Sequence, residues 1–112
     1  MPSGEMSGSV LCAASSYIQK FYLGPEYANL PKEVQEQLKI IAVEFTEDVG
    51  GIFLMVYDRD GHLGLQSRAD DGDYLYDEIG ADLKLRSLRT QYRDLFEKLE
   101  LYYTAMQSLR KS

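Results

Sequence analysis

The stretch Ile52-Phe-Leu-Met-Val-Tyr57 is followed, after one turn, by Leu63-Gly-Leu-Gln-Ser-Arg-Ala69. The first run is rich in β-branched and aromatic residues, and the second alternates with a period of two, which is typical of strands. Between them, Asp58-Arg-Asp-Gly61 has the composition of a type I turn with glycine in the left-handed position. This part of the chain therefore predicts an antiparallel β-hairpin.

The first strand of this hairpin is apolar on both sides. One side carries Ile52, Leu54 and Val56, and the other carries Phe53, Met55 and Tyr57. Strands of this kind lie in the interior of a sheet, and a two-stranded ribbon alone is only marginally stable in water. We therefore expect other elements to cover the second face and the free edge of this strand.

Two helices are predicted before the hairpin. The first follows from apolar residues at helical spacing, namely Leu11, Ala14, Ile18 and Phe21. The second begins at Pro31 and ends at Gly50-Gly51. Its apolar stripe is formed by Val34, Leu38, Ile41 and Phe45.

Two further helices are predicted after the hairpin. Asp73 can cap a short helix over residues 74–79. The strongest periodic signal follows, because apolar residues step alternately by three and four from Leu85 to Leu109. The predicted fold class is therefore α+β, with two N-terminal helices, a central antiparallel β-hairpin, a short helix and a long C-terminal amphipathic helix over residues 82–109.

The chain is expected to form one domain over residues 10–112, preceded by a loose tail over residues 1–9. Cys12 is the only cysteine, which excludes an intrachain disulfide and fits a reducing compartment. The apolar run at residues 10–14 has no basic residue before it, and it is too short for a signal peptide or a membrane span. We expect a cytoplasmic protein without a membrane anchor.

The formal net charge of -6 at pH 7 repels a phosphate backbone, so nucleic acid is not an expected partner. Residues 83–112 nevertheless hold seven bases against three acids. Among them, Arg86, Arg89 and Arg93 form a candidate basic patch for phosphate or an acidic partner. The favoured interpretation is a solvated flank that pairs with the acidic stretch before it.

Acidic residues gather near Gly72, where the candidate cation ligands are Asp71, Asp73, Asp77 and Glu78. An EF-hand loop centred on this glycine fails, because Ser67 and Ala69 would occupy its first and third ligand positions. Turn and cap chemistry is the favoured explanation of these acids. His62 is the only histidine and has no cysteine near it in the sequence, so we predict no zinc site, cofactor or catalytic residue. Plentiful carboxylates leave the enzyme question open.

The predicted long helix would measure about 40 Å, whereas a compact domain of this size is roughly 30 to 35 Å across. This excess length and the two-sided strand favour a homodimer. The candidate interface residues are Phe53, Met55, Tyr57, Leu95, Leu99, Tyr102 and Met106. The sequence leaves open whether the dimer forms through the hairpin edge or the long helix, and a monomer with a covered hairpin is the alternative.

Three stretches resemble a known family: Phe45-Thr-Glu-Asp-Val-Gly-Gly51, Gly72-Asp-Tyr-Leu-Tyr-Asp-Glu-Ile-Gly80 and Phe96-Glu-Lys-Leu-Glu-Leu-Tyr-Tyr103. With them, the chain resembles short uncharacterised proteins of anaerobic Firmicutes over about residues 21–103. The resemblance implies a bacterial, cytoplasmic domain of unknown function, and it supplies no site residues.

These observations are consistent with two functions. The favoured one is a non-enzymatic protein-interaction domain that self-associates and whose acidic turn region faces a protein partner. The alternative is a regulatory domain that binds a small molecule or a divalent cation through the acidic residues near Gly72.

Overall fold

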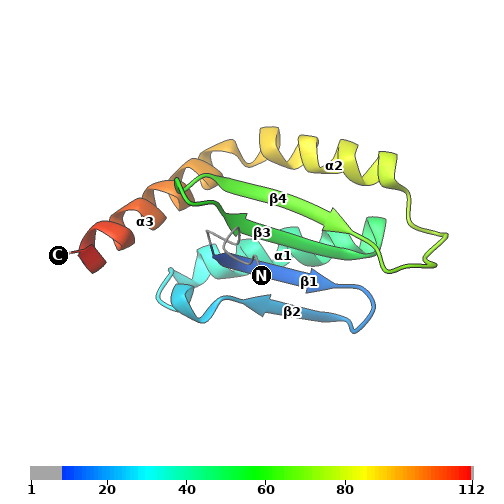
Figure 1. Cartoon of the computed structure of the whole chain (residues 1–112), viewed down its shortest axis with the longest axis horizontal. Helices are drawn as coiled ribbons and strands as arrows, with labels where there is room; N and C mark the ends of the chain where they lie inside the picture. The colour runs from blue at the N-terminus through cyan, green and yellow to red at the C-terminus, as the bar shows by residue number, and fades with distance from the viewer. Residues whose placement is uncertain (1–8, 112) are drawn as a thin grey trace.

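The computed structural model describes residues 9–111, which form a four-stranded antiparallel sheet and three α-helices (Figure 1). The strands are β1 (Val10–Ser15), β2 (Lys20–Leu23), β3 (Ile52–Tyr57) and β4 (Leu63–Arg68), and their order across the sheet is β2-β1-β3-β4. The helices are α1 (Lys32–Val49), α2 (Glu78–Gln91) and α3 (Arg93–Lys111), with a short 3-10 helix, η2 (Pro25–Tyr27), before α1. The predicted α+β class is confirmed. Residues 1–8 of the expected tail lie outside the described residues.

The prediction that two helices precede the β3–β4 hairpin is wrong, because the β1–β2 hairpin stands in place of the first helix and only α1 remains. Ala14 and Phe21 do share a face, but as cross-strand neighbours, and Ile18 is exposed in the turn between the strands. β1 also pairs with β3, where Ala14 lies opposite Phe53. This long-range pairing supplies the edge partner that β3 requires, and it overrides the helical spacing of the local sequence.

The two predicted C-terminal helices are also wrong in their extents. Asp77, rather than Asp73, caps α2, and its Oδ1 accepts a hydrogen bond from the Ile79 amide at 3.1 Å. The long helix is interrupted at Tyr92, whose backbone angles (φ -112°, ψ 29°) are not helical. The bend lets Leu88 of α2 and Leu99 of α3 both reach the core.

The predicted hairpin and the helix before it are confirmed. β3 and β4 pair in a register that runs from Ile52 opposite Arg68 to Tyr57 opposite Leu63. In the turn, Asp58 Oδ1 accepts hydrogen bonds from the amides of Asp60 (2.8 Å) and His62 (3.0 Å). The hydrogen bond from His62 is the main cause that lowers the pKa of the Asp58 carboxyl.

All three helices lie on one side of the sheet. Phe53 packs against Phe45 of α1, with ring centroids 4.8 Å apart, and Tyr57 stacks on Tyr103 of α3 at 4.3 Å. Since Phe53 and Tyr57 share a face of β3, α1 and α3 cover the same face. An ion pair between Lys84 and Asp48 joins α2 to α1. The shortest dimension of the molecule, 24 Å, matches one layer of sheet and one layer of helices.

Tyr57 connects the sheet to α3 and gives a test of this packing. Its side chain is fully buried, and its hydroxyl donates a hydrogen bond to the Leu99 carbonyl at 2.8 Å. Burial raises the pKa of this hydroxyl above its ordinary value.

We predict that Tyr57→Phe lowers the free energy of unfolding by about 1 kcal/mol, because one buried hydrogen bond is lost. Tyr57→Ala should lower it by about 3 to 5 kcal/mol through cavity formation. Urea denaturation measures both, with Leu109→Ala as the control because Leu109 is exposed at the end of α3 and lies outside the sheet. Equal stability of Tyr57→Phe and the control would show that the contact with α3 is not formed.

Candidate functional site

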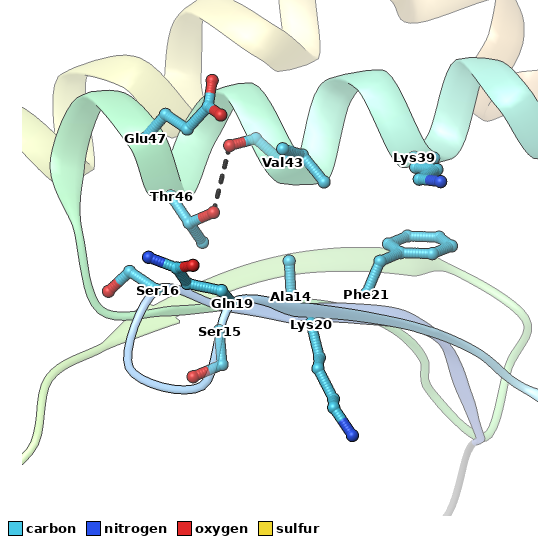
Figure 2. Close-up of a pocket in the computed structure, with 10 residues that line it drawn as sticks. All are labelled: Ala14, Ser15, Ser16, Gln19, Lys20, Phe21, Lys39, Val43, Thr46 and Glu47. Carbon is cyan, nitrogen blue, oxygen red and sulfur yellow. Dashed lines mark hydrogen bonds between the residues drawn. The ribbon is translucent and has the colours of Figure 1, made fainter.

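The three α-helices of residues 9–111 leave one face of the sheet uncovered, namely the face opposite to them (Figure 1). Figure 2 shows the alternation: Ala14 and Phe21 point toward α1, whereas Ser15 and Lys20 point away from it. Apart from the irregularity between Val10 and Cys12 in β1, every second residue of each strand therefore lies on this outer side. We call it the open face; it is formed by Val10, Ala13, Ser15, Lys20, Tyr22, Ile52, Leu54, Val56, Gly64, Gln66 and Arg68.

Apolar residues occupy the middle of the open face, and polar residues occupy its two sides. One row across the sheet consists of Tyr22, Ala13, Leu54 and Gln66. The next row consists of Lys20, Ser15, Ile52 and Arg68. The three aliphatic side chains of β3 on this face are only half-buried. An apolar centre within a polar rim is the usual anatomy of a protein–protein interface.

The open face is also positively charged. The chain has 18 acidic residues, and none of them lies in the four strands. Lys20 and Arg68 are the charged residues of this face, and they stand at the two ends of the same row. A partner surface with negative charge would therefore complement it.

The β4 edge of the sheet is capped by side chains from α2 and α3. Arg89 Nη2 donates a hydrogen bond to the Leu63 carbonyl (2.9 Å), and the Leu63 amide donates to Glu100 Oε2 (2.7 Å). These bonds occupy backbone groups that an exposed edge would offer to another strand. At this end of the hairpin, the face of the sheet rather than the edge is thus the available surface.

The candidate basic patch has three different surroundings. Arg89 caps Leu63, as described above, and Arg86 Nη2 lies 3.0 Å from Asp82 Oδ2 in an exposed ion pair. Arg93 begins α3 beyond the bend, where it lines a shallow hollow with Arg89. The structure therefore brings Arg89 and Arg93 together, while Arg86 and Arg89 each contact another group of the same chain.

Residues 70–78, which we call the acidic loop, contain the four candidate cation ligands. Asp73 Oδ2 accepts a hydrogen bond from the Tyr17 hydroxyl (2.6 Å), and Asp73 Oδ1 accepts one from the Leu75 amide (3.2 Å). Asp77 caps α2, whereas Asp71 and Glu78 are exposed. Within residues 9–111, no group of three or more His, Cys, Asp or Glu side chains is placed to hold a metal ion.

The candidate interface residues lie mainly against the core. Phe53, Met55 and Tyr57 are fully buried under the helices, and Leu99 is buried beside them. The others, Leu95, Tyr102 and Met106, are partly buried and pack on the same core. The outer surface of β3 is therefore formed by Ile52, Leu54 and Val56. The alternation of the sequence placed these three residues on the side of the strand opposite to Phe53, Met55 and Tyr57.

A groove of about 800 Å³ lies between α1 and the β1–β2 hairpin (Figure 2). Ala14, Phe21 and Val43 provide apolar lining, and Lys39 and Glu47 lie on the helix beside it. The Thr46 hydroxyl is already used, because it donates to the Val43 carbonyl at 3.0 Å. Small-molecule sites have volumes in this range.

Cys12 does not have the environment of a catalytic thiol. Its side chain is fully buried on β1, and desolvation raises the pKa of the thiol to about 12. His62 is exposed in the turn between β3 and β4. A buried, protonated thiol of this kind acts as a small core residue.

These features describe an α+β domain with one open sheet face. The chain belongs to a family of unknown function, DUF6145, whose profile matches residues 8–111. No curated protein and no solved structure gives a significant match. In the part of the chain that the structure describes, no helix is both long and apolar enough to cross a membrane.

We predict that Arg89→Ala combined with Glu100→Ala lowers the free energy of unfolding by about 1 to 2 kcal/mol, because two hydrogen bonds at the β4 edge are lost. The double variant should also aggregate sooner on heating, which light scattering would detect, since the edge is exposed. Arg86→Ala is the control, because exposed ion pairs contribute at most about 1 kcal/mol. Double and control variants that match in stability and scattering would contradict the capping role.

Proposed function

We propose that this protein is a non-enzymatic interaction domain that forms a homodimer through the open face of its sheet. The main support for this proposal is the row of Ile52, Leu54 and Val56, which lies on a face that no helix of residues 9–111 covers. The polar rim around this row supports the same function, because it would limit nonspecific association. Two-fold pairs are the commonest soluble oligomers.

The driving force is the completion of burial on both copies. At roughly 1 kcal/mol for each half-buried aliphatic side chain, the six side chains of Ile52, Leu54 and Val56 in two copies contribute about 6 kcal/mol. Association costs at least about 4 kcal/mol in lost translational and rotational freedom. The apolar row therefore favours pairing, and contacts around it must supply the rest of the affinity.

The non-enzymatic part of the proposal is supported by the roles that the reactive side chains already have. The Cys12 thiol is shielded, and Asp73 and Asp77 accept hydrogen bonds that shape the acidic loop and cap α2. We also propose that the dimer works in the bacterial cytoplasm. The resemblance described above and the single buried cysteine, which fits a reducing compartment, support this setting.

The groove beside α1 favours a second function, a regulatory domain that binds a small amphipathic molecule. Phe21 and Val43 would contact its apolar part, and Lys39 would attract a carboxylate. A thermal-shift screen of small organic acids tests this function, because a ligand of the folded state raises the melting temperature. Val43→Glu should remove the shift. A rise in melting temperature with calcium, magnesium or manganese that EDTA reverses would instead support a regulatory domain that binds a divalent cation.

We predict that Leu54→Lys weakens the homodimer by at least about a hundredfold, because a charge would be buried at the apolar centre of the interface. In the monomer this lysine can reach solvent, so the fold should persist. Sedimentation equilibrium over a range of concentrations measures the dissociation constant, and circular dichroism checks the fold.

Leu101→Lys is the matched control, because Leu101 is 70% exposed on α3 and lies away from the open face. It should dimerise as the wild type does. The proposal fails if the wild type is monomeric at high micromolar concentration, or if the two lysine variants dissociate equally.

A further inference from the structure

We propose that the acidic loop of each copy packs on the open face of the other copy, where Tyr74 and Leu75 cover the apolar row of β3. This inference rests on the proposed homodimer and names the segment that completes its interface. It commits to a second copy of this chain as the occupant of the open face.

The acidic loop holds two large apolar side chains in solvent. Leu75 is 95% exposed and Tyr74 is 94% exposed, which makes them the most exposed large apolar residues described. The loop is nevertheless anchored on both sides of this pair. Asp73 accepts the hydrogen bond from Tyr17, and the Tyr76 hydroxyl is hydrogen-bonded to Ser67. An anchored pair loses little conformational entropy on binding, as is favourable for interface residues.

The charges of the loop and the open face are complementary. The loop contains five acidic residues and no base. The open face contains Lys20 and Arg68 and no acid. Two open faces alone would repel each other, and so would two loops, whereas a loop placed on the face of another copy is attracted to it.

The loop and the charged row lie at the same end of the sheet. Arg68 is the last residue of β4, and the loop starts two residues later. Figure 1 shows the segment after β4 extending past the end of the strands. A two-fold axis along the strands would place these ends of the two sheets together, so each loop would meet the Lys20 and Arg68 row of the other copy. Such reciprocal contacts close the assembly at two chains.

The area of the sheet also indicates that the loop is needed. Four strands about 4.8 Å apart and about 20 Å long present roughly 400 Å² in plan. Specific interfaces bury about 800 Å² per partner. Tyr74 and Leu75 would add on the order of 300 Å², which brings the contact close to the usual size.

Complementary charge reversal tests the inference. The face variant is Lys20→Glu with Arg68→Glu, and the loop variant is Asp70→Lys with Asp71→Lys and Glu78→Lys, which changes the loop from five negative charges to a net charge of +1. Asp70, Asp71 and Glu78 are chosen because Asp73 and Asp77 carry the internal hydrogen bonds of the segment. In low-salt buffer, each variant alone should dimerise at least about tenfold more weakly than the wild type, because both of its contacts repel. An equimolar mixture should regain the wild-type affinity, since both contacts then attract.

A second pair of variants leaves the charge unchanged. Tyr74→Ser with Leu75→Ser should weaken the homodimer by at least about tenfold, because buried apolar area is lost. Leu109→Ser is the matched control, since Leu109 is 76% exposed at the end of α3, and it should dimerise normally. Sedimentation equilibrium measures every variant, and melting temperatures confirm folding.

The outcomes separate this inference from the proposed function. If each charge-reversed variant dimerised as tightly as the wild type, or if their mixture did not regain the wild-type affinity, the loop contact would be overturned. The proposed homodimer would remain. A monomeric wild type would overturn both. If a synthetic leucine–lysine peptide bound the wild type, and the double serine variant lost that binding but kept its dimer affinity, the loop would belong to a basic protein partner and the inference would fail.

Discussion

β3 has to lie in the interior of the molecule, because its six side chains are apolar or aromatic on both of its faces. The fold meets this requirement in three directions: β1 and β4 pair with its two edges, and α1 and α3 cover Phe53, Met55 and Tyr57 on one face. The remaining face of β3 carries Ile52, Leu54 and Val56, and no helix of residues 9–111 covers it. The proposed pairing of two chains follows from this remaining requirement.

The placement of charge agrees with this geometry. Acidic residues are absent from the strands, and five of them lie in the acidic loop. At the start of β4, Arg89 and Glu100 occupy the backbone groups of Leu63, which hinders pairing with another strand there. The molecule therefore offers a face for association, with attraction where a loop meets that face and repulsion where like surfaces meet.

Local signals predicted the β3–β4 hairpin and α1, because turn glycines and periodic apolar residues specify them directly. The β1–β2 hairpin could not be predicted this way, since its stability comes from pairing with β3, about forty residues away in the chain. The bend at Tyr92 has no glycine or proline to mark it. The candidate interface residues Phe53, Met55 and Tyr57 lie on the inner face of β3, whereas Ile52, Leu54 and Val56 lie on its outer face. The register of the hairpin could have identified the inner face, because the apolar residues Leu63 and Leu65 of β4 lie opposite Tyr57 and Met55.

The central claim is that the outer face of β3 is buried against a second copy. An isotope-filtered NMR experiment on a mixture of labelled and unlabelled protein tests it most directly, since it detects contacts between copies only. The account predicts intermolecular NOEs to the methyl groups of Ile52, Leu54 and Val56. A dimer whose intermolecular NOEs involve only α3 residues such as Leu95 and Met106, or a sample without any, would contradict it.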